Sequence, residues 1–403
     1  MRSALLVWER LWDWLTRTAK PRVQAGGHRL DARTWVRAGK VFLCRSRRRA
    51  RSESLKWRSP KMVNFPQFHV IPGAATAEIL DGQERSTIDI VEAAYRAHDM
   101  GQTINPPSYF LRFPDHPSDR IIALPAALTG DGGPVDGIKW ISSFPGNLSK
   151  GLPRASAVLI LNDAQTGYPF SCLEASIISA TRTAASAALA ADLLRGDQQR
   201  PRTVTYFGGG LIAKYVHRYL VHSGWHFDTA TVFDAYPTFG HAFAERLGEL
   251  GGVERTDVVQ SPEQAIRASE LVIFATTAGE PHVSEPAWFD HAPIVLHLSL
   301  RDLSPEVILS SVNVVDDVEH CLKANTSPHL AEQLTGSRDF ITATLPQVMA
   351  GQTVREQGRP VAFSPFGLGV LDLALGLHLH REAMRRGLAI EVPNFFSELS
   401  RYA

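Results

Sequence analysis

Three glycines follow a run of β-forming residues near the middle of the chain, in "TVTYFGGGLIAKY". Gly208, Gly210 and Ala213 have the spacing G-x-G-x-x-A of a dinucleotide-binding turn. The first glycine makes the tight turn, the second lets the backbone approach a pyrophosphate, and the small third residue lets the helix pack closely on the strand. Free N–H groups at the start of that helix favour an anion. The pattern therefore predicts a dinucleotide phosphate site.

The next predicted strand, "TVFD", ends in Asp234. A carboxylate at this place accepts hydrogen bonds from a ribose 2′-hydroxyl and repels a 2′-phosphate, so it favours NAD over NADP. The alternative is that Asp234 caps the helix expected in "AYPTFGHAF". Further along, "FATTAG" places Thr276 and Thr277 after the fourth strand of this fold, at the edge where such folds line the cofactor cleft.

Two cations lie in apolar surroundings before the glycine turn. Lys139 is flanked by Ile138 and Trp140, and Arg182 lies in the otherwise apolar helical stretch "ISATRTAASAALAA". Lys and Arg are rarely buried unless they are paired. Either each of them has a structural carboxylate partner, or they face a site for an anionic ligand.

A second charged pair follows an apolar strand of the cofactor fold. Arg301 and Asp302 come after "VLHLSL", at the carboxyl edge where hydride transfer would take place. Asp302 could cap the helix that begins near Ser304, or it could act as a general base.

The elements that must position these residues fall into two groups. From about 195 to 325, strands alternate with helices, which predicts a parallel, doubly wound sheet. Before it, "FHVI", "SYFLRF", "RIIALPAAL", "VDGIKWISSF" and "ASAVLILND" are typical of the strands of a meandering sheet. We expect "STIDIVEAAYRAHDMG" to be a helix capped by Ser86 and ended by Gly101, and "PFSCLEASIISATRTAASAALAADLL" to be helical throughout.

The stretch after 325 is expected to be helical, with too few strands for a third domain, and to pack on the first group of elements. The predicted fold class is therefore α/β, with a Rossmann-type doubly wound sheet (195–325) inserted into an α+β domain. That second domain, formed by 62–194 and 326–403, would bind substrate and form a dimer.

Charge is distributed unevenly along the 403 residues. Residues 1–61 hold 17 Lys and Arg against 4 Asp and Glu, and the remainder is acidic. This basic segment could be an arm for nucleic acid or an anionic membrane, a targeting segment, or an extension upstream of a true start at Met62. We favour the last, so residues 1–61 are expected to be disordered or non-native. With no nucleic-acid motif in the acidic remainder, no nucleic-acid partner is expected.

Cys44, Cys172 and Cys321 share no C-x-x-C spacing, so neither a disulfide framework nor a metal site is predicted. No stretch was expected to reach the length of a membrane span. These features favour a cytoplasmic protein without a membrane partner.

Four stretches, "GIKWISSFPGN", "ISATRTAASAALAA", "FGGGLIA" and "SPFGLGVLDLALG", occur in the order in which a known family has them. From about Phe68 to Ala389 the chain resembles the ornithine cyclodeaminase and mu-crystallin family. The resemblance implies NAD as cofactor and a homodimer that forms through the domain outside the Rossmann fold, often by extending its sheet.

Within that family the chain is similar to the NAD-dependent dehydrogenases of 2,3-diaminopropionate biosynthesis, through "GLPRASAVLILND" and "LHLSLRDLSPEVI". Those enzymes oxidise N-(2-amino-2-carboxyethyl)-L-glutamate and release L-2,3-diaminopropionate and 2-oxoglutarate. The product usually feeds siderophore or peptide-antibiotic assembly. The resemblance also implies that a PLP-dependent synthase supplies the substrate.

The resemblance assigns roles to single residues. The family's substrate-carboxylate lysine falls on Lys139, its catalytic aspartate on Asp302, and its arginines on Arg112 and Arg182. Arg154 and Arg301 are additional cations that favour a substrate with three carboxylates over ornithine, which has one. The expected catalytic residues are Asp302 and Lys139. The residues expected to bind substrate are Arg112, Lys139, Arg154, Arg182 and Arg301. The residues expected to bind the cofactor are Thr183, Gly208, Gly210, Leu211, Ile212, Asp234, Thr276, Thr277 and Ser299.

Two alternatives remain at this stage. Ornithine cyclodeaminases, which convert ornithine to proline and ammonia, and related amino- or imino-acid dehydrogenases use the same fold, although Glu306 stands where the cyclodeaminases have a lysine-like position. The other is a mu-crystallin-like protein that binds a nicotinamide cofactor without turnover.

Overall fold

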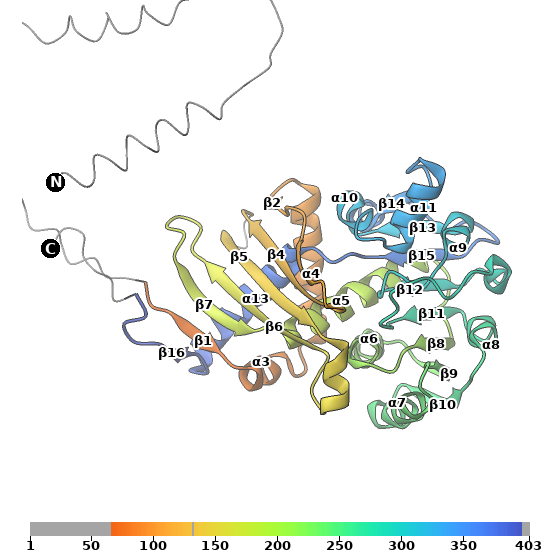
Figure 1. Cartoon of the computed structure of the whole chain (residues 1–403), viewed down its shortest axis with the longest axis horizontal. Helices are drawn as coiled ribbons and strands as arrows, with labels where there is room; N and C mark the ends of the chain where they lie inside the picture. The colour runs from red at the N-terminus through yellow and green to blue at the C-terminus, as the bar shows by residue number, and fades with distance from the viewer. Residues whose placement is uncertain (1–65, 131–132, 397–403) are drawn as a thin grey trace, which may run out of the picture. The chain divides into compact units, whose positions relative to one another are not determined.

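The computed structural model describes residues 66–130 and 133–396, and the predicted basic extension 1–61 lies outside this range. The described part contains two eight-stranded sheets with helices packed on them (Figure 1). This is the predicted α/β class.

The first sheet has the order β16-β1-β7-β6-β5-β4-β2, and β3 also pairs with β4. Its neighbours run antiparallel, except that β1 and β7 are parallel. The strands are β1 (His69–Ile71), β2 (Thr103–Ile104), β3 (Tyr109–Phe113), β4 (His116–Leu128), β5 (Val135–Ser143), β6 (Ala155–Asn162), β7 (Pro169–Glu174) and β16 (Ile390–Glu391).

Four helices accompany this sheet: α3 (Gly73–Leu80), α4 (Glu84–Asp99), α5 (Ser176–Leu194) and α13 (Gly369–Arg386). Helix α13 packs on β4, β5 and β6. A side chain at Gly137 of β5 would come within 2.8 Å of Leu373, so this glycine lets the helix approach the sheet closely. A short 3-10 helix, η1 (Pro145–Lys150), follows β5.

Helix α4 begins three residues earlier than expected. Gln83 occupies the N-cap position without a side-chain cap, and Ser86 lies inside the helix, so the predicted Ser86 cap was wrong. The helix ends as expected near Gly101, which has a positive φ of 69°.

The stretch predicted to be one long helix from Pro169 is divided. "PFSCLE" forms strand β7, whose side chains alternate in burial, and the helix begins only at Ser176. The carboxylate of Glu174 accepts the free N–H groups of Ser176 at 2.7 Å and Ile177 at 3.3 Å, which stabilises the start of α5.

Helix α5 also corrects the expectation about membrane spans. By length and composition it could cross a membrane, but 67% of the apolar window in Ser176–Leu194 is buried inside the fold. Such burial is typical of the core helix of a folded domain.

The second sheet is parallel throughout, with the order β10-β9-β8-β11-β12-β15-β13-β14. Its strands are β8 (Thr203–Phe207), β9 (Phe227–Phe233), β10 (Val253–Val258), β11 (Leu271–Phe274), β12 (Ile294–His297), β13 (Val312–Val315), β14 (Ile341–Thr344) and β15 (Val361–Ser364). Its helices are α6 (Leu211–His222), α7 (Pro237–Leu250), α8 (Pro262–Arg267), η2 (Pro286–Phe289), α9 (Pro305–Ser310), α10 (Val318–Cys321), α11 (Ser327–Thr335) and α12 (Leu345–Met349).

The end of this sheet does not coincide with the expected boundary at residue 325. Strands β14 and β15 follow that residue, and β15 lies between β12 and β13. Each has only four residues, and β15 is buried along its whole length, so its short apolar run lacks the alternation that marks a half-buried strand. The chain returns to the first sheet only with α13.

Helices α5 and α6 pack against each other between the two sheets (Figure 1). Helix α4 also contacts α6. The first sheet and the parallel sheet are thus joined through helix contacts, which bring side chains from both within reach of a common site.

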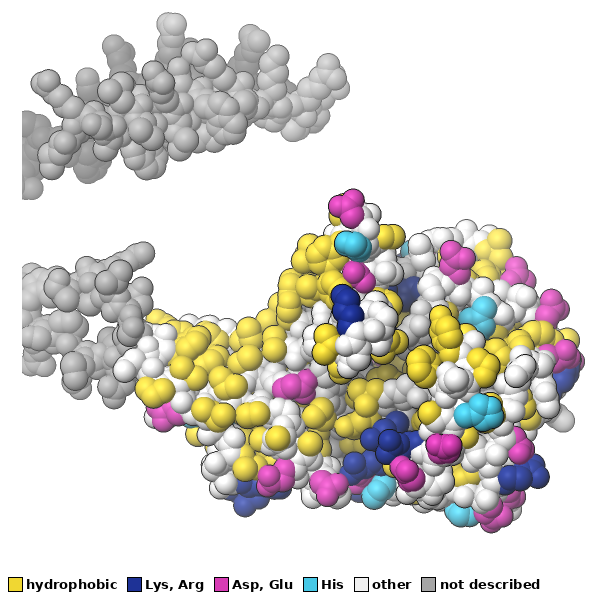
Figure 2. Space-filling view, turned by 60° about the horizontal axis from the view of Figure 1, so that its bottom comes forward, with side chains coloured by type: hydrophobic (Ala, Val, Ile, Leu, Met, Phe, Trp, Pro, Cys, Tyr) yellow, Lys and Arg dark blue, Asp and Glu magenta, His cyan; other side chains and the backbone are white. Residues whose placement is uncertain are grey.

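The other face of the first sheet carries exposed hydrophobic side chains. Tyr109, Trp140 and Val158 lie in one cross-strand row, and they are 69%, 42% and 39% exposed. Leu111, two residues beyond Tyr109 on β3, extends the same face. Figure 2 shows hydrophobic side chains gathered on the part of the molecule that this sheet forms.

Candidate active site

The glycine turn joins β8 to α6 and has the features of a phosphate site. Gly208 has a φ of 88°, and a Cβ there would come within 2.8 Å of the carbonyl oxygen of Ala275. Gly210 is the N-cap of α6, has no side chain to occupy the first turn, and has open space around it. Leu211 and Ile212 then begin the helix. The free N–H groups at the start of α6 fit a pyrophosphate.

Asp234 follows β9 and is tied to the same turn. Its Oδ2 accepts the backbone N–H of Gly209 at 3.0 Å, and its Oδ1 accepts that of Tyr236 at 2.9 Å. Helix α7 begins at Pro237 with Tyr236 as its N-cap and receives no side-chain cap. Asp234 therefore does not cap α7, and its role at the ribose stays a prediction.

Strand order explains why these residues meet. Strand β8 lies between β9 on one side and β11 on the other, so the chain changes direction across the sheet at this point. Ligands of doubly wound sheets bind beyond the carboxyl ends of the strands at such a switch point. The glycine turn, Asp234, Thr276 and Asp302 all follow the carboxyl ends of these strands or of β12.

Asp302 is enclosed by hydrogen-bond donors. Its side chain has no exposed surface, and the hydroxyls of Thr276 and Ser299 donate to its two oxygens. His282 Nε2 lies 3.1 Å from Oδ1. Burial would raise the pKa of Asp302, but the His282 and His297 rings and the Ser299 hydroxyl hold it well below the usual range of an aspartate.

These contacts bear on the predicted roles of Thr276, Ser299 and Asp302. The hydroxyls of Thr276 and Ser299, which we expected at the cofactor, instead hydrogen-bond Asp302. The cap of α9 is Ser304, whose side chain accepts the N–H of Val307, so Asp302 does not cap that helix. The roles of Asp302 as a base and of Thr276 and Ser299 as cofactor ligands stay predictions.

Thr183 and Thr277 also stay predictions. The Thr183 hydroxyl donates to the carbonyl of Ser179 at 2.7 Å, within α5, and Thr277 is exposed after β11.

Lys139 and Arg182 share one buried carboxylate. Lys139 Nζ lies 2.7 Å from Asp372 Oδ2, and Arg182 Nε lies 3.2 Å from Asp372 Oδ1. Asp372 of α13 is fully buried and Lys139 is 1% exposed. Of the two alternatives for these buried cations, the structure shows the one in which they have a structural carboxylate partner. One anion, however, faces two cations. The three side chains together therefore carry an excess of one positive charge.

Asp372 was missed by the sequence analysis. The feature that could have identified it is a single acidic residue in the otherwise apolar helical stretch "GVLDLALG". The pKa of Lys139 is lowered to about 8, mainly by burial and then by the charge of Arg182. The carboxylate of Asp372 raises this pKa but does not fully offset the two effects.

Four arginines form a second group, which we call the arginine cluster: Arg112, Arg120, Arg154 and Arg301. Arg112 and Arg120 are directly paired across β3 and β4, and Arg120 is paired with Ser143 of β5. Arg154 Nη1 donates to Ser143 Oγ at 2.6 Å. The sequence analysis missed Arg120, because its place beside Arg112 follows only from the hairpin register.

Electrostatic coupling shows that the members of the arginine cluster are close to one another. Burial and then Arg112 lower the pKa of Arg120, while burial and then Arg120 lower that of Arg154. Burial, Arg120 and Arg112 lower the pKa of Arg301, which comes from the parallel sheet. Within residues 66–130 and 133–396, no member forms an ion pair with a carboxylate. Such a group of cations fits an anionic ligand.

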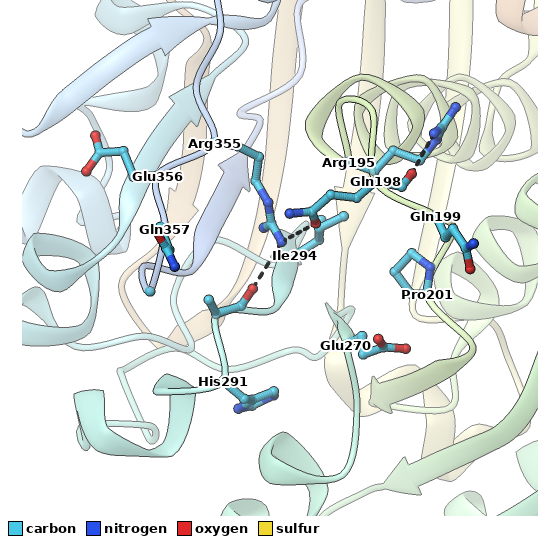
Figure 3. Close-up of a pocket in the computed structure, with 12 residues that line it drawn as sticks. Arg195, Gln198, Gln199, Pro201, Glu270, His291, Ile294, Arg355, Glu356 and Gln357 are labelled. Carbon is cyan, nitrogen blue, oxygen red and sulfur yellow. Dashed lines mark hydrogen bonds between the residues drawn. The ribbon is translucent and has the colours of Figure 1, made fainter.

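A cavity of about 410 Å³ lies at the opposite edge of the parallel sheet (Figure 3). Pro201, Glu270 and Ile294 line it at the amino ends of β8, β11 and β12. Arg355 crosses it and donates to Gln198 Oε1 at 2.9 Å and to the carbonyl of Ala292 at 3.3 Å. Its position excludes this cavity as the phosphate site of the glycine turn.

Replacing Asp372 tests the shared-carboxylate arrangement. Asp372→Asn keeps the size of the side chain but leaves two buried cations without their counter-charge. We expect the free energy of unfolding to fall by about 3–5 kcal/mol. Chemical denaturation measures this, with Asp89→Asn as control, because the exposed Asp89–Arg85 pair should contribute less than about 1 kcal/mol. Equal effects of the two substitutions would contradict the arrangement.

Comparison with known proteins identifies the family. The sequence pattern of the ornithine cyclodeaminase/mu-crystallin family matches residues 77–386. N-((2S)-2-amino-2-carboxyethyl)-L-glutamate dehydrogenase of Staphylococcus aureus is 28% identical over 75% of this chain and 91% of its own. The structure of Thermococcus litoralis Δ1-pyrroline-2-carboxylate reductase with NADH and L-proline has a TM-score of 0.72, is 26% identical, and matches 81% of this chain and all of that one.

An archaeal alanine dehydrogenase dimer with bound NAD shares the fold, with a TM-score of 0.71 and 23% identity over 82% of this chain and 100% of that chain. The cofactor is NAD, and the protein is an NAD-dependent oxidoreductase that acts on the C–N bonds of amino acids. The chain belongs to the ornithine cyclodeaminase/mu-crystallin family.

Proposed function

We propose that the protein oxidises N-(2-amino-2-carboxyethyl)-L-glutamate with NAD and releases L-2,3-diaminopropionate and 2-oxoglutarate. The observation that carries this proposal is the arginine cluster. Four neighbouring cations without carboxylate partners among the described residues suit a ligand with several negative charges. The relative from Staphylococcus aureus, which is named for this substrate, supports the same conclusion.

Members of both groups of cations lie on one face of the first sheet. Lys139 and Ser143 are four residues apart on β5, so their side chains point to the same side, about 13 Å apart along the strand. Arg120 shares that side because it is the direct partner of Ser143. An elongated substrate with carboxylates at both ends matches this spacing better than a small amino acid.

The chemistry follows from the position of these groups. The glycine turn and Asp234 would hold NAD, which would supply the oxidant for hydride loss from the α-carbon of the glutamate part. The arginines and Lys139 hold the carboxylates and fix that carbon, which is a positioning role. Water then adds to the resulting C=N bond, and the C–N bond breaks to give the ketone and the amine. This step needs a group that moves protons.

Ornithine is a weaker candidate as substrate. It has one carboxylate and a side-chain ammonium, which the arginine cluster would repel. A cyclodeaminase therefore remains the second candidate only through the family to which the chain belongs.

The proposal extends to the place of the protein in metabolism. We propose a cytoplasmic enzyme whose substrate comes from a PLP-dependent synthase and whose product feeds siderophore or peptide-antibiotic assembly. These points are supported by the similarity of the sequence to the 2,3-diaminopropionate dehydrogenases.

The test is an assay of NADH formation with synthetic N-(2-amino-2-carboxyethyl)-L-glutamate, with the products identified by mass spectrometry. We expect NADH, 2-oxoglutarate and 2,3-diaminopropionate in equal amounts, and little turnover of ornithine or alanine. Arg120→Gln should raise KM for the substrate about 10- to 100-fold, because a charged hydrogen bond contributes roughly 1.5–3 kcal/mol. Arg85→Gln, a surface change on α4, is the control. Faster turnover of ornithine than of the glutamate conjugate would overturn the proposal.

The exposed apolar face of the first sheet supports a homodimer. The row of Tyr109, Trp140 and Val158 would be covered by a second copy. We expect the protein to sediment as a dimer and Trp140→Asp to shift it towards the monomer. Leu334→Asp, which changes an exposed leucine on α11, should leave the dimer intact. A monomeric wild-type protein at micromolar concentration would contradict this prediction.

A further inference from the structure

We infer that His282 is the residue that moves protons in this reaction, and that Asp302 acts through it. The inference rests on the proposed function for its substrate. His282 lies between β11 and β12 and was not singled out by its sequence context.

Asp302 is poorly placed to take a proton itself. Its side chain has no exposed surface, and Thr276, Ser299 and His282 all approach its oxygens as donors. Donors on a carboxylate stabilise the ionised form, which makes it a weak base. A general base works best when its pKa is near the operating pH, and the pKa of Asp302 is held far below it.

His282 is the neighbour of Asp302 that reaches the surface. Its side chain is 35% exposed, and its Nε2 lies 3.1 Å from Asp302 Oδ1. An ionised carboxylate fixes the neutral ring with its proton on Nε2, which leaves Nδ1 as a proton acceptor. In the described part of the chain, no residue hydrogen-bonds that Nδ1. A base oriented by a buried carboxylate is a recurring catalytic arrangement.

The backbone holds this pair in a fixed geometry. The N–H groups of His282 and Val283 both donate to the carbonyl oxygen of Asp302, each at 2.9 Å. Val283 also forms a β-bridge with Leu303. The loop that carries His282 is therefore fastened to the segment that carries Asp302.

The pair lies beside the cofactor turn. The His282 ring centroid is 6.4 Å from that of Phe207, the last residue of β8 before Gly208. This places the exposed imidazole at the carboxyl edge of the parallel sheet, where the reacting carbon must meet the cofactor.

The other titratable side chains around Asp302, His297 and Arg301, are not placed to exchange protons with the substrate. His297 is fully buried, with its Nε2 3.3 Å from Asp302 Oδ2 and its Nδ1 3.1 Å from Ser364 Oγ. Arg301 stays protonated at any working pH and donates to the carbonyl of Ala324 at 2.8 Å. His282 is the titratable group of this set that is both hydrogen-bonded to the carboxylate and exposed.

The proton steps balance around His282. After hydride transfer the substrate carries a protonated C=N group. Water attacks its carbon, and His282 Nδ1 takes one proton from that water as the C–O bond forms. The imidazolium then gives this proton to the nitrogen while the remaining hydroxyl loses its own proton to solvent. The C–N bond breaks with its electron pair on nitrogen, giving the ketone and the neutral amine, which then takes up a proton from solvent.

Kinetics of His282→Gln with the NAD-loaded enzyme test the role. Glutamine keeps a donor for Asp302 but cannot accept a proton, so kcat should fall about 10²- to 10⁴-fold while KM for NAD and the melting temperature stay close to wild type. His226→Gln, an exposed histidine before β9, should leave kcat unchanged. The pH profile of the glutamine variant should lose its acidic limb. A fall of less than tenfold would overturn the inference.

A double variant distinguishes a joint role of His282 and Asp302 in proton movement from two independent roles. Asp302→Asn should also lower kcat, and the double variant with His282→Gln should lose no more than the worse single variant, because the two residues act as a unit. Multiplication of the two losses would contradict a role of Asp302 through His282.

Nuclear magnetic resonance of histidine labelled with nitrogen-15 gives a readout that does not need turnover. The His282 ring should be neutral with its proton on Nε2 at high pH, and Asp302→Asn should shift this tautomer. A proton on Nδ1 of the neutral ring would overturn the inference whatever the substrate is. Failure of the wild type to oxidise the glutamate conjugate, with the expected tautomer present, would instead count against the proposed substrate alone.

Discussion

Asp372 is a buried carboxylate that holds cations from two different elements, Lys139 of β5 and Arg182 of α5. Removing three charged groups from water is costly, so the arrangement persists only while all three remain together. It therefore fixes the position of α13 relative to the sheet and to α5. Because two positive charges face one negative charge, the same contact leaves this end of the site attractive to a carboxylate.

The candidate site is formed by residues of both sheets. One sheet contributes side chains from its face, and the other contributes residues at the carboxyl ends of its strands. The antiparallel sheet supplies a line of cations on one face, from Lys139 to Arg120, since alternate residues of a strand share a side. The parallel sheet supplies the cofactor turn and the His282–Asp302 pair at the carboxyl ends of its strands. In the reaction we propose, substrate binding and proton movement are divided between the two sheets, which α5 and α6 join.

The sequence allowed prediction of what is local. Gly208 and Gly210 specify a turn through their own backbone, so spacing alone predicted the turn that joins β8 to α6. Asp372 and Arg120 escaped prediction because their roles come from partners distant in the sequence or from strand register. The two four-residue strands after residue 325 were not predicted for the same reason, because such short runs can be recognised as strands only from their pairing within a sheet. The alternation of strands and helices, in contrast, was sufficient for the fold class.

The central claim is that cations at both ends of one sheet face bind the carboxylates of a single elongated substrate. A crystal structure of the complex with NADH and N-(2-amino-2-carboxyethyl)-L-glutamate tests it most directly, because the reduced cofactor cannot accept a hydride. We expect one carboxylate beside Lys139 and Arg182 and another within hydrogen-bond distance of Arg120 or its neighbours in the arginine cluster. A substrate whose carboxylates contact neither group would contradict it.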